Sequence, residues 1–168
     1  NADGTKLCWI RYDEQAVPTY SLQLFKGLEP ERMENTDYPS LYSYKYPKAG
    51  QRNSTVTAWS YDIKSRRTQK LQVLVDADGY MPRIYPTDDP ERIIIFTFNR
   101  HQDDLRLYAV NPSSTLSQLL IQEKVNKYVK EEAMENIAIL KNSILMPSDR
   151  DGFNHLYIYN MNGQLIRK

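Results

Sequence analysis

Along most of the chain, apolar and polar residues alternate in short stretches that end at Asn, Asp, Gly or Pro. This pattern predicts β-strands joined by tight turns. The stretches around Trp59, Tyr108 and Tyr157 share one layout and lie 49 residues apart. The sequence therefore contains an internal repeat.

A polar turn residue follows each of these strands at the same interval. Asp62, Asn111 and Asn160 keep the 49-residue spacing and sit where a hairpin needs tight turn geometry. Repeats of roughly 40 to 50 residues made of strands are typical of β-propeller blades. The pattern thus predicts an all-β chain that forms part of a β-propeller.

Two repeats each contain four candidate strands, the number that a blade needs. The middle repeat has them at 80–85, 92–98, 105–110 and 115–121, and the third repeat at 137–140, 143–147, 155–159 and 164–167. We expect 93–98, which is rich in Ile and Phe, to be the most buried strand, covered on both faces.

The first repeat is incomplete. It opens with a turn at 1–4 and a strand at 6–12, so the innermost strand is missing, and an insertion at 13–54 precedes the next strand. We therefore predict an incomplete first blade at 1–78 with this insertion, a complete blade at 79–123 and another at 124–168. A propeller typically needs 4 to 8 blades. The chain is thus expected to be a fragment of a single propeller domain of a larger protein.

The insertion contains a strand at 20–25 and a segment dense in tyrosine. Tyr42, Tyr44 and Tyr46 alternate along it, which places three rings on one side of an extended chain. This segment can be a strap packed outside the sheets or an aromatic platform for a ligand.

Charge and composition suggest no further partner. The chain has 22 Lys and Arg against 21 Asp and Glu, a net charge of +1. These charges are scattered along the sequence, so they give no reason to expect a nucleic acid or an anionic membrane surface. A single cysteine, Cys8, excludes an intrachain disulfide. No apolar run approaches the roughly 20 residues of a membrane span, no N-terminal signal segment is evident, and no cofactor is indicated.

Three segments, at 3–20, 46–53 and 148–159, resemble in order and spacing the N-terminal β-propeller of bacterial dipeptidyl peptidase IV enzymes. The most specific of them begins with the run Tyr46-Pro47-Lys48-Ala49-Gly50 and ends at Asn53. The resemblance implies a serine exopeptidase that releases dipeptides with Pro or Ala in second position. It also implies that the propeller gates and shapes the substrate chamber, that an α/β-hydrolase domain of the same parent chain performs the chemistry, and that the enzyme is periplasmic or extracellular.

The catalytic groups of that family are not expected in this chain. None of the 6 glycines forms a Gly-x-Ser-x-Gly nucleophile elbow. The resemblance further implies a Glu-Glu pair that binds the substrate's α-ammonium group, and this pair would lie upstream of Asn1. Glu131 and Glu132 form another such pair, but the mixed-charge stretch around them is also typical of a solvated loop or short helix. They are the candidate substrate-binding residues of this chain.

Other chemical candidates are weaker. The stretch 149–154 has the carboxylate spacing of a calcium loop but lacks its terminal Glu, so a β-turn is favoured. His101 and His155 have no third ligand for zinc, and we expect His155 to pack or form hydrogen bonds between blades.

Two function classes follow from the sequence. One is the non-catalytic propeller part of a dipeptidyl peptidase, which has peptides as substrates. The other is a binding or scaffold propeller with no peptidase partner. The reading frame beyond Lys168 distinguishes them, because only the first class requires a hydrolase domain with a nucleophile elbow. In either class, an arc of blades leaves apolar sheet faces uncovered, and the chain is expected to self-associate as a homo-oligomer.

We predict that the chain of 168 residues alone does not hydrolyse Gly-Pro or Ala-Pro chromogenic substrates, because it lacks the groups for nucleophilic attack. Turnover above the buffer blank that a point substitution in this chain abolishes would contradict the prediction.

Overall fold

The computed structural model describes residues 1–25 and 38–168, in two compact units. The first unit comprises Asn1–Tyr12 and Thr55–Lys168, and the second comprises Asp13–Ser54. Residues 26–37 of the predicted insertion lie outside the described part. No helix among the described residues is long and apolar enough to cross a membrane.

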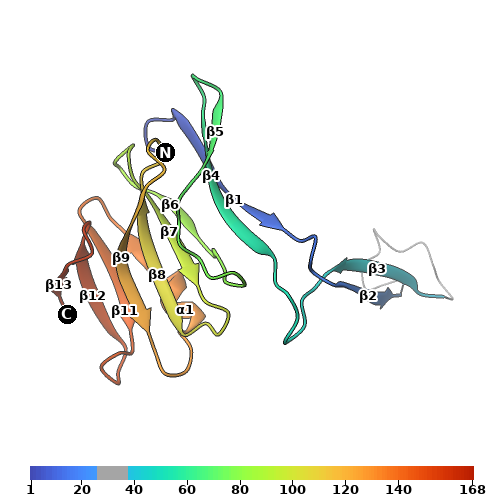
Figure 1. The fold of residues 1–168 in the computed structure, drawn as a ribbon. Helices are drawn as coiled ribbons and strands as arrows, with labels where there is room; N and C mark the ends of the chain where they lie inside the picture. Colours follow the sequence, from blue (N-terminus) through green and yellow to red (C-terminus); the bar gives the residue numbers. More distant parts are fainter. Residues whose placement is uncertain (26–37) are drawn as a thin grey trace. The chain divides into compact units, whose positions relative to one another are not determined.

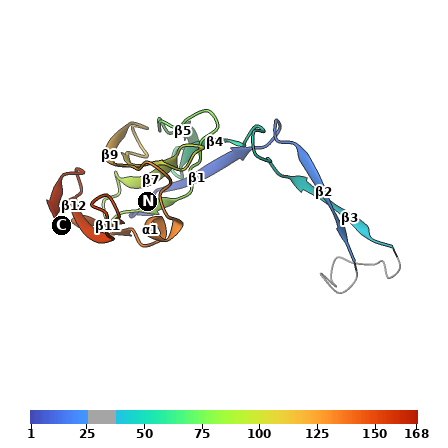
Figure 2. The ribbon, with the colours of Figure 1, turned by 90° about the horizontal axis from the view of Figure 1, so that it is seen from below.

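Three sheets form the first unit, standing side by side in chain order (Figures 1 and 2). The first sheet has the order β1-β4-β5, the second β6-β7-β8-β9 and the third β10-β11-β12-β13. The chain is thus a partial β-propeller with two four-stranded blades and a first blade that lacks its innermost strand, as the repeat predicts. The strands of this unit are β1 (Lys6–Asp13), β4 (Thr55–Asp62), β5 (Arg67–Lys70), β6 (Ile84–Pro86), β7 (Ile93–Phe98), β8 (Asp104–Val110), β9 (Ser117–Lys124), β10 (Ala138–Ile139), β11 (Ser143–Ser148), β12 (His155–Asn160) and β13 (Leu165–Arg167), and the helix α1 (Glu131–Glu135) precedes β10.

The repeated aromatic residues occupy equivalent strands. Tyr108 lies on β8 and Tyr157 on β12, each the third strand of its sheet. Trp59 lies on β4, the middle of three strands, which is the equivalent place in a blade without its first strand. The predicted register of the repeat is confirmed.

The repeated turn residues explain why each third strand ends where it does. The side-chain oxygen of Asp62 accepts a hydrogen bond from the backbone N–H of Ser65 at 2.7 Å. Asn111 accepts one in the same way from Ser113 at 2.8 Å, and Asn160 from Asn162 at 3.0 Å. Each side chain thereby takes the place of a backbone partner and closes the turn to the outermost strand.

Strand β7 is buried along its whole length, which confirms the prediction for 93–98. Ile93 and Ile95 point into a core shared with the first sheet. Ile94, Phe96 and Phe98 point into a second core shared with the third sheet. Both faces of the strand are therefore covered by neighbouring blades.

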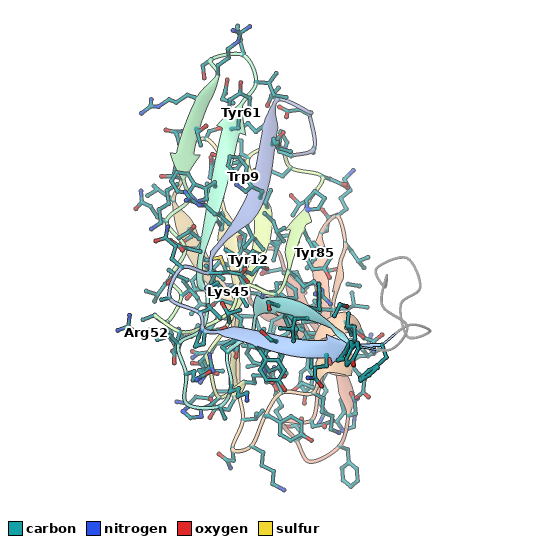
Figure 3. All side chains as sticks on the ribbon, turned by 90° about the vertical axis from the view of Figure 1, so that its right-hand side faces the viewer. Trp9, Tyr12, Lys45, Arg52, Tyr61 and Tyr85 are labelled. Carbon is teal, nitrogen blue, oxygen red and sulfur yellow. The ribbon has the colours of Figure 1, made fainter. Side chains whose placement is uncertain are left out.

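The first sheet buries one of its faces against the second sheet. Cys8 and Ile10 of β1 pack against the core that contains Ile93 and Ile95. Trp9 and Tyr61 alternate with inward-facing residues, and their side chains lie on the other face, which is turned to the viewer in Figure 3.

A charged cluster joins the second blade to the third. Glu123 of β9 is only 5% exposed, and its carboxylate pairs with the guanidinium of Arg150 and accepts a hydrogen bond from the Ser148 hydroxyl. Arg150 also lies 4.4 Å from the centre of the Tyr157 ring, at cation–π distance. A buried carboxylate is tolerated here because it is both paired and hydrogen-bonded.

The second unit is a hairpin of β2 (Thr19–Leu24) and β3 (Ser40–Lys45). Tyr20 pairs with Tyr44 across the strands, and the Tyr42 and Tyr44 rings stack with their centres 5.4 Å apart. Tyr46 meets Tyr20 at 5.9 Å. The predicted alternation of Tyr42, Tyr44 and Tyr46 is confirmed, and a role as strap or platform stays a prediction.

Glycine is required at position 163 for two separate reasons. Its φ is +81°, and a Cβ atom there would overlap the backbone carbonyl of Leu120 in the neighbouring blade. Gly152 also has a positive φ, +88°, but a Cβ atom there would meet no atom within 4 Å. A substitution at Gly152 therefore tests only the effect of the positive φ on stability, whereas one at Gly163 tests the positive φ and the close backbone contact together.

We predict that Gly163→Ala lowers the free energy of unfolding by more than about 3 kcal/mol, because the blades must move apart. Gly152→Ala is the matched control and should cost only about 1 to 2 kcal/mol, the penalty of a left-handed conformation. Urea unfolding followed by circular dichroism measures both values. Equal losses in the two variants would show that the contact with Leu120 contributes nothing.

Candidate functional site

A cleft of about 430 Å³ lies in the first unit where the chain enters the innermost strands of the second and third blades. Its volume falls within the range of small-ligand sites, roughly 300 to 1,000 Å³. Most of its walls are aromatic or apolar, and a few polar groups converge on them. The lining residues are Tyr12, Tyr80, Met81, Pro82, Arg83, Phe98, Gln102, Tyr128, Val129, Glu131 and Met134.

One wall is the extended segment that leads into β6. Tyr80 and Phe98 exchange backbone hydrogen bonds of 2.7 and 2.9 Å, which extends the pairing with β7 beyond β6. The carbonyl of Arg83 accepts a further bond from the Phe96 N–H at 3.0 Å. This wall is therefore held by the most buried strand of the molecule.

The opposite wall is the connection from β9 to α1. Gln102, at φ 59°, turns the chain after β7, and its carbonyl accepts a hydrogen bond from the Val129 N–H at 2.8 Å. Met134 of α1 is buried in the core between the second and third sheets. The short helix is thus anchored by one apolar side chain and one preceding backbone contact.

The polar groups of the cleft carry both signs of charge. Arg83 lies 3.6 Å from a carboxylate oxygen of Glu135, and both side chains remain substantially exposed. Glu131 lines the same cleft. The Tyr12 hydroxyl donates to the Met81 carbonyl at 3.4 Å. Aromatic walls with one guanidinium and one carboxylate are suited to a ligand that has apolar side chains and charged or amide groups, such as a peptide.

The two predicted substrate-binding residues differ in position. Glu131 lines the cleft, and Glu132 is exposed and is not part of its lining. The backbone carbonyl of Glu132 accepts hydrogen bonds from the Asn136 backbone and side chain at 3.0 and 2.7 Å. The pair forms the start of a short helix, one of the two local structures expected, and its role in substrate binding stays a prediction.

The candidate calcium loop is a turn whose carboxylates are engaged by cations of the protein. Gly152 donates its N–H to the Asp149 carbonyl at 2.8 Å, with the positive φ of a tight turn. Asp149 forms an ion pair with Lys130 at 2.6 Å, and its hydrogen bond raises the pKa of Lys130. Asp151 pairs with Lys168.

Neither histidine lies in a metal site. Within 1–25 and 38–168, no group of three or more His, Cys, Asp and Glu side chains is placed to hold a metal ion. His101 and His155 are both exposed. His155 therefore does not pack between blades, and the alternative that it forms hydrogen bonds there stays a prediction.

Most of the cleft could not be identified from the sequence. Tyr12 and Met81 are 69 residues apart in the chain, and Tyr80, Arg83 and Tyr128 lie in segments without a recognisable motif. Only Glu131 carried a signal, the adjacent pair of carboxylates. The other lining residues depend on how the blades pack.

A family model described as the dipeptidyl peptidase IV (DPP IV) N-terminal region matches residues 1–168. The fold is similar to the crystal structure of Porphyromonas gingivalis dipeptidyl peptidase 4, with a TM-score of 0.88 and 36% sequence identity. This match covers 99% of the chain and 23% of the Porphyromonas chain.

Fungal relatives show the same relation in sequence. A "Probable dipeptidyl-aminopeptidase B" of Phaeosphaeria nodorum is 30% identical over 132 residues, which are 74% of this chain and 14% of the relative. A "Probable dipeptidyl peptidase 4" of Aspergillus flavus is 25% identical over 179 residues, 96% of this chain and 22% of the relative. The chain thus spans less than a quarter of the length of each of these proteins.

Tyr157, beside the Asp149–Gly152 turn, provides a pH test of the local contacts. Burial and the 2.5 Å hydrogen bond to Asp151 raise the pKa of the Tyr157 hydroxyl from 10 to about 12. A raised pKa means that the folded state holds this proton more tightly than the unfolded state. The stabilisation is therefore fully present below pH 10 and is lost as the pH rises through about 12.

We predict that, between these two pH values, the stability of the wild-type chain falls more steeply with pH than that of Tyr157→Phe. Urea unfolding at several alkaline pH values measures both slopes. Parallel slopes would mean that Tyr157 ionises as readily in the folded state as in the unfolded state.

Proposed function

Because the chain belongs to the family of the dipeptidyl peptidase IV N-terminal region, we propose that it is the non-catalytic propeller part of a serine exopeptidase. This enzyme releases dipeptides with Pro or Ala in second position from the N-termini of peptides. The observation that carries the proposal is the match of the family over all 168 residues. An α/β-hydrolase domain of the same parent chain supplies the catalytic groups, and the enzyme works in the periplasm or outside the cell.

The cleft contributes to the substrate chamber by shaping and gating it. Its aromatic walls, which include Tyr80 and Tyr128, suit the apolar side chains of a peptide. Glu131 offers a carboxylate to an amide N–H of the peptide, a charge-assisted hydrogen bond. Arg83 offers a guanidinium to a peptide carbonyl.

Glu132 supplies a matched control for Glu131. The two residues are adjacent on one helix, carry the same charge and are both exposed, but only Glu131 lines the cleft. A hydrogen bond to a charged group contributes about 1.5 to 3 kcal/mol, which corresponds to about tenfold or more in binding.

We predict that Glu131→Gln lowers kcat/KM of the full-length protein for an Ala-Pro chromogenic substrate by about tenfold. Glu132→Gln should leave kcat/KM within about twofold of the wild type, because an exposed charge outside the site contributes little. Equal effects of the two substitutions on kcat/KM would show that the cleft does not bind the substrate. A reading frame beyond Lys168 without a nucleophile elbow would overturn the peptidase assignment itself.

A further inference from the structure

The three hairpins that join the third and fourth strands of the blades differ in charge. In the first blade, Lys64, Arg66, Arg67 and Lys70 fall within the stretch 62–70, at the hairpin of β4 and β5. The corresponding stretch of the second blade, 111–119, contains no charged residue, and that of the third blade, 160–168, contains two cations at its end, Arg167 and Lys168. Because all three hairpins form equivalent turns, the turn itself does not require these cations.

The positive charge of the β4–β5 hairpin is not neutralised locally. Its one acidic residue, Asp62, pairs with Lys6 of β1 and also accepts hydrogen bonds from Ser65. The four cations of the hairpin are exposed, and none of them forms an ion pair with another residue of 1–25 or 38–168. The prediction that the charges are scattered rather than clustered on one element therefore does not hold for this hairpin.

One of the cations occupies a position that favours glycine. Arg66 has φ 58°, and the corresponding hairpins have Thr115 at φ 69° in the second blade and Gly163 at φ 81° in the third. A residue with a side chain is disfavoured in this left-handed conformation. A side chain at this turn position is thus tolerated in two of the three blades, and only in the first blade is it a cation.

An apolar side chain accompanies the cations. Ile63 is 55% exposed and precedes Lys64 directly at the hairpin. Exposed cations beside an exposed aliphatic side chain are typical of attachment to a lipid interface, where phosphate groups bind the cations and the aliphatic group enters the headgroup region.

We propose that the β4–β5 hairpin is an attachment site for a membrane surface that carries anionic phospholipids. We take a membrane rather than a single-stranded nucleic acid as the partner because the apolar side chain among the cations, Ile63, is aliphatic, whereas bound bases stack on aromatic rings. The attachment is independent of the proposed peptidase function, since the residues of the cleft are elsewhere in the fold.

Vesicle co-sedimentation at low ionic strength tests the proposal on the 168-residue chain. We expect binding to vesicles of phosphatidylcholine mixed with phosphatidylglycerol, and none to phosphatidylcholine alone. The triple variant Lys64→Gln, Arg66→Gln, Arg67→Gln should bind on the order of a hundredfold more weakly, at about fivefold for each cation lost.

A matched control removes the same charge elsewhere. Lys124→Gln, Lys127→Gln and Lys141→Gln replace three exposed lysines of the other blades, and this variant should bind within a few-fold of the wild type. Ile63→Ser should weaken vesicle binding with all charges kept. Lys64→Gln with Arg66→Gly provides a second hairpin variant in which the turn is relieved of strain, so a loss of binding there does not come from unfolding.

Three results would overturn the proposal. The first is no binding of the wild-type chain to the anionic vesicles. The second is an equal loss of binding in the control variant, which would indicate net charge rather than this hairpin. The third is hairpin-dependent binding to a single-stranded DNA oligonucleotide without binding to vesicles, which would assign the cations to a soluble polyanion.

Discussion

The arrangement of the first unit depends on the burial of β7 on both of its faces. A strand with apolar side chains on alternate sides needs one cover for Ile93 and Ile95 and another for Ile94, Phe96 and Phe98. The neighbouring sheets supply these covers, so three sheets become one packed body. The same strand forms backbone bonds with Tyr80 and Arg83, and its burial therefore also fixes one wall of the cleft.

Polar contacts at the blade junctions add positional specificity to this apolar packing. Glu123 and Arg150 meet across the junction of the second and third blades, and the Ser60 hydroxyl donates to the Pro112 carbonyl across the other junction at 2.8 Å. If one partner of a buried polar contact is removed, the other has lost its bound water without gaining a hydrogen bond, which costs free energy. A shift of one blade against the next would break these contacts, so each pair favours the observed arrangement of the blades.

The strands could be predicted from the sequence because their determinants are local. The alternation of apolar and polar residues along β8, and the turn residue Asn111 that follows it, can each be recognised from a few neighbouring positions. The repeat then allows each predicted strand to be compared with the strands at the same position in the other two repeats. The cleft depends instead on contacts such as that of Tyr12 with Met81, between residues far apart in the chain. The four cations of the β4–β5 hairpin are visible in the sequence, but their lack of ion-pair partners among the described residues is not. The one acidic residue of this hairpin, Asp62, pairs with Lys6 of β1, a contact between residues 56 positions apart in the chain.

The close approach at Gly163 bears on the curvature of the whole arc. Gly163 lies in the β12–β13 hairpin and Leu120 lies on β9, so the contact joins the outer edges of two successive blades. In a propeller the outer edges diverge from the axis, and their spacing sets the angle between neighbouring sheets. A glycine at position 163 allows the backbones of the two blades to touch here, where a larger residue would force them apart. The missing side chain at position 163 therefore sets how closely the outer edges of these two sheets approach each other.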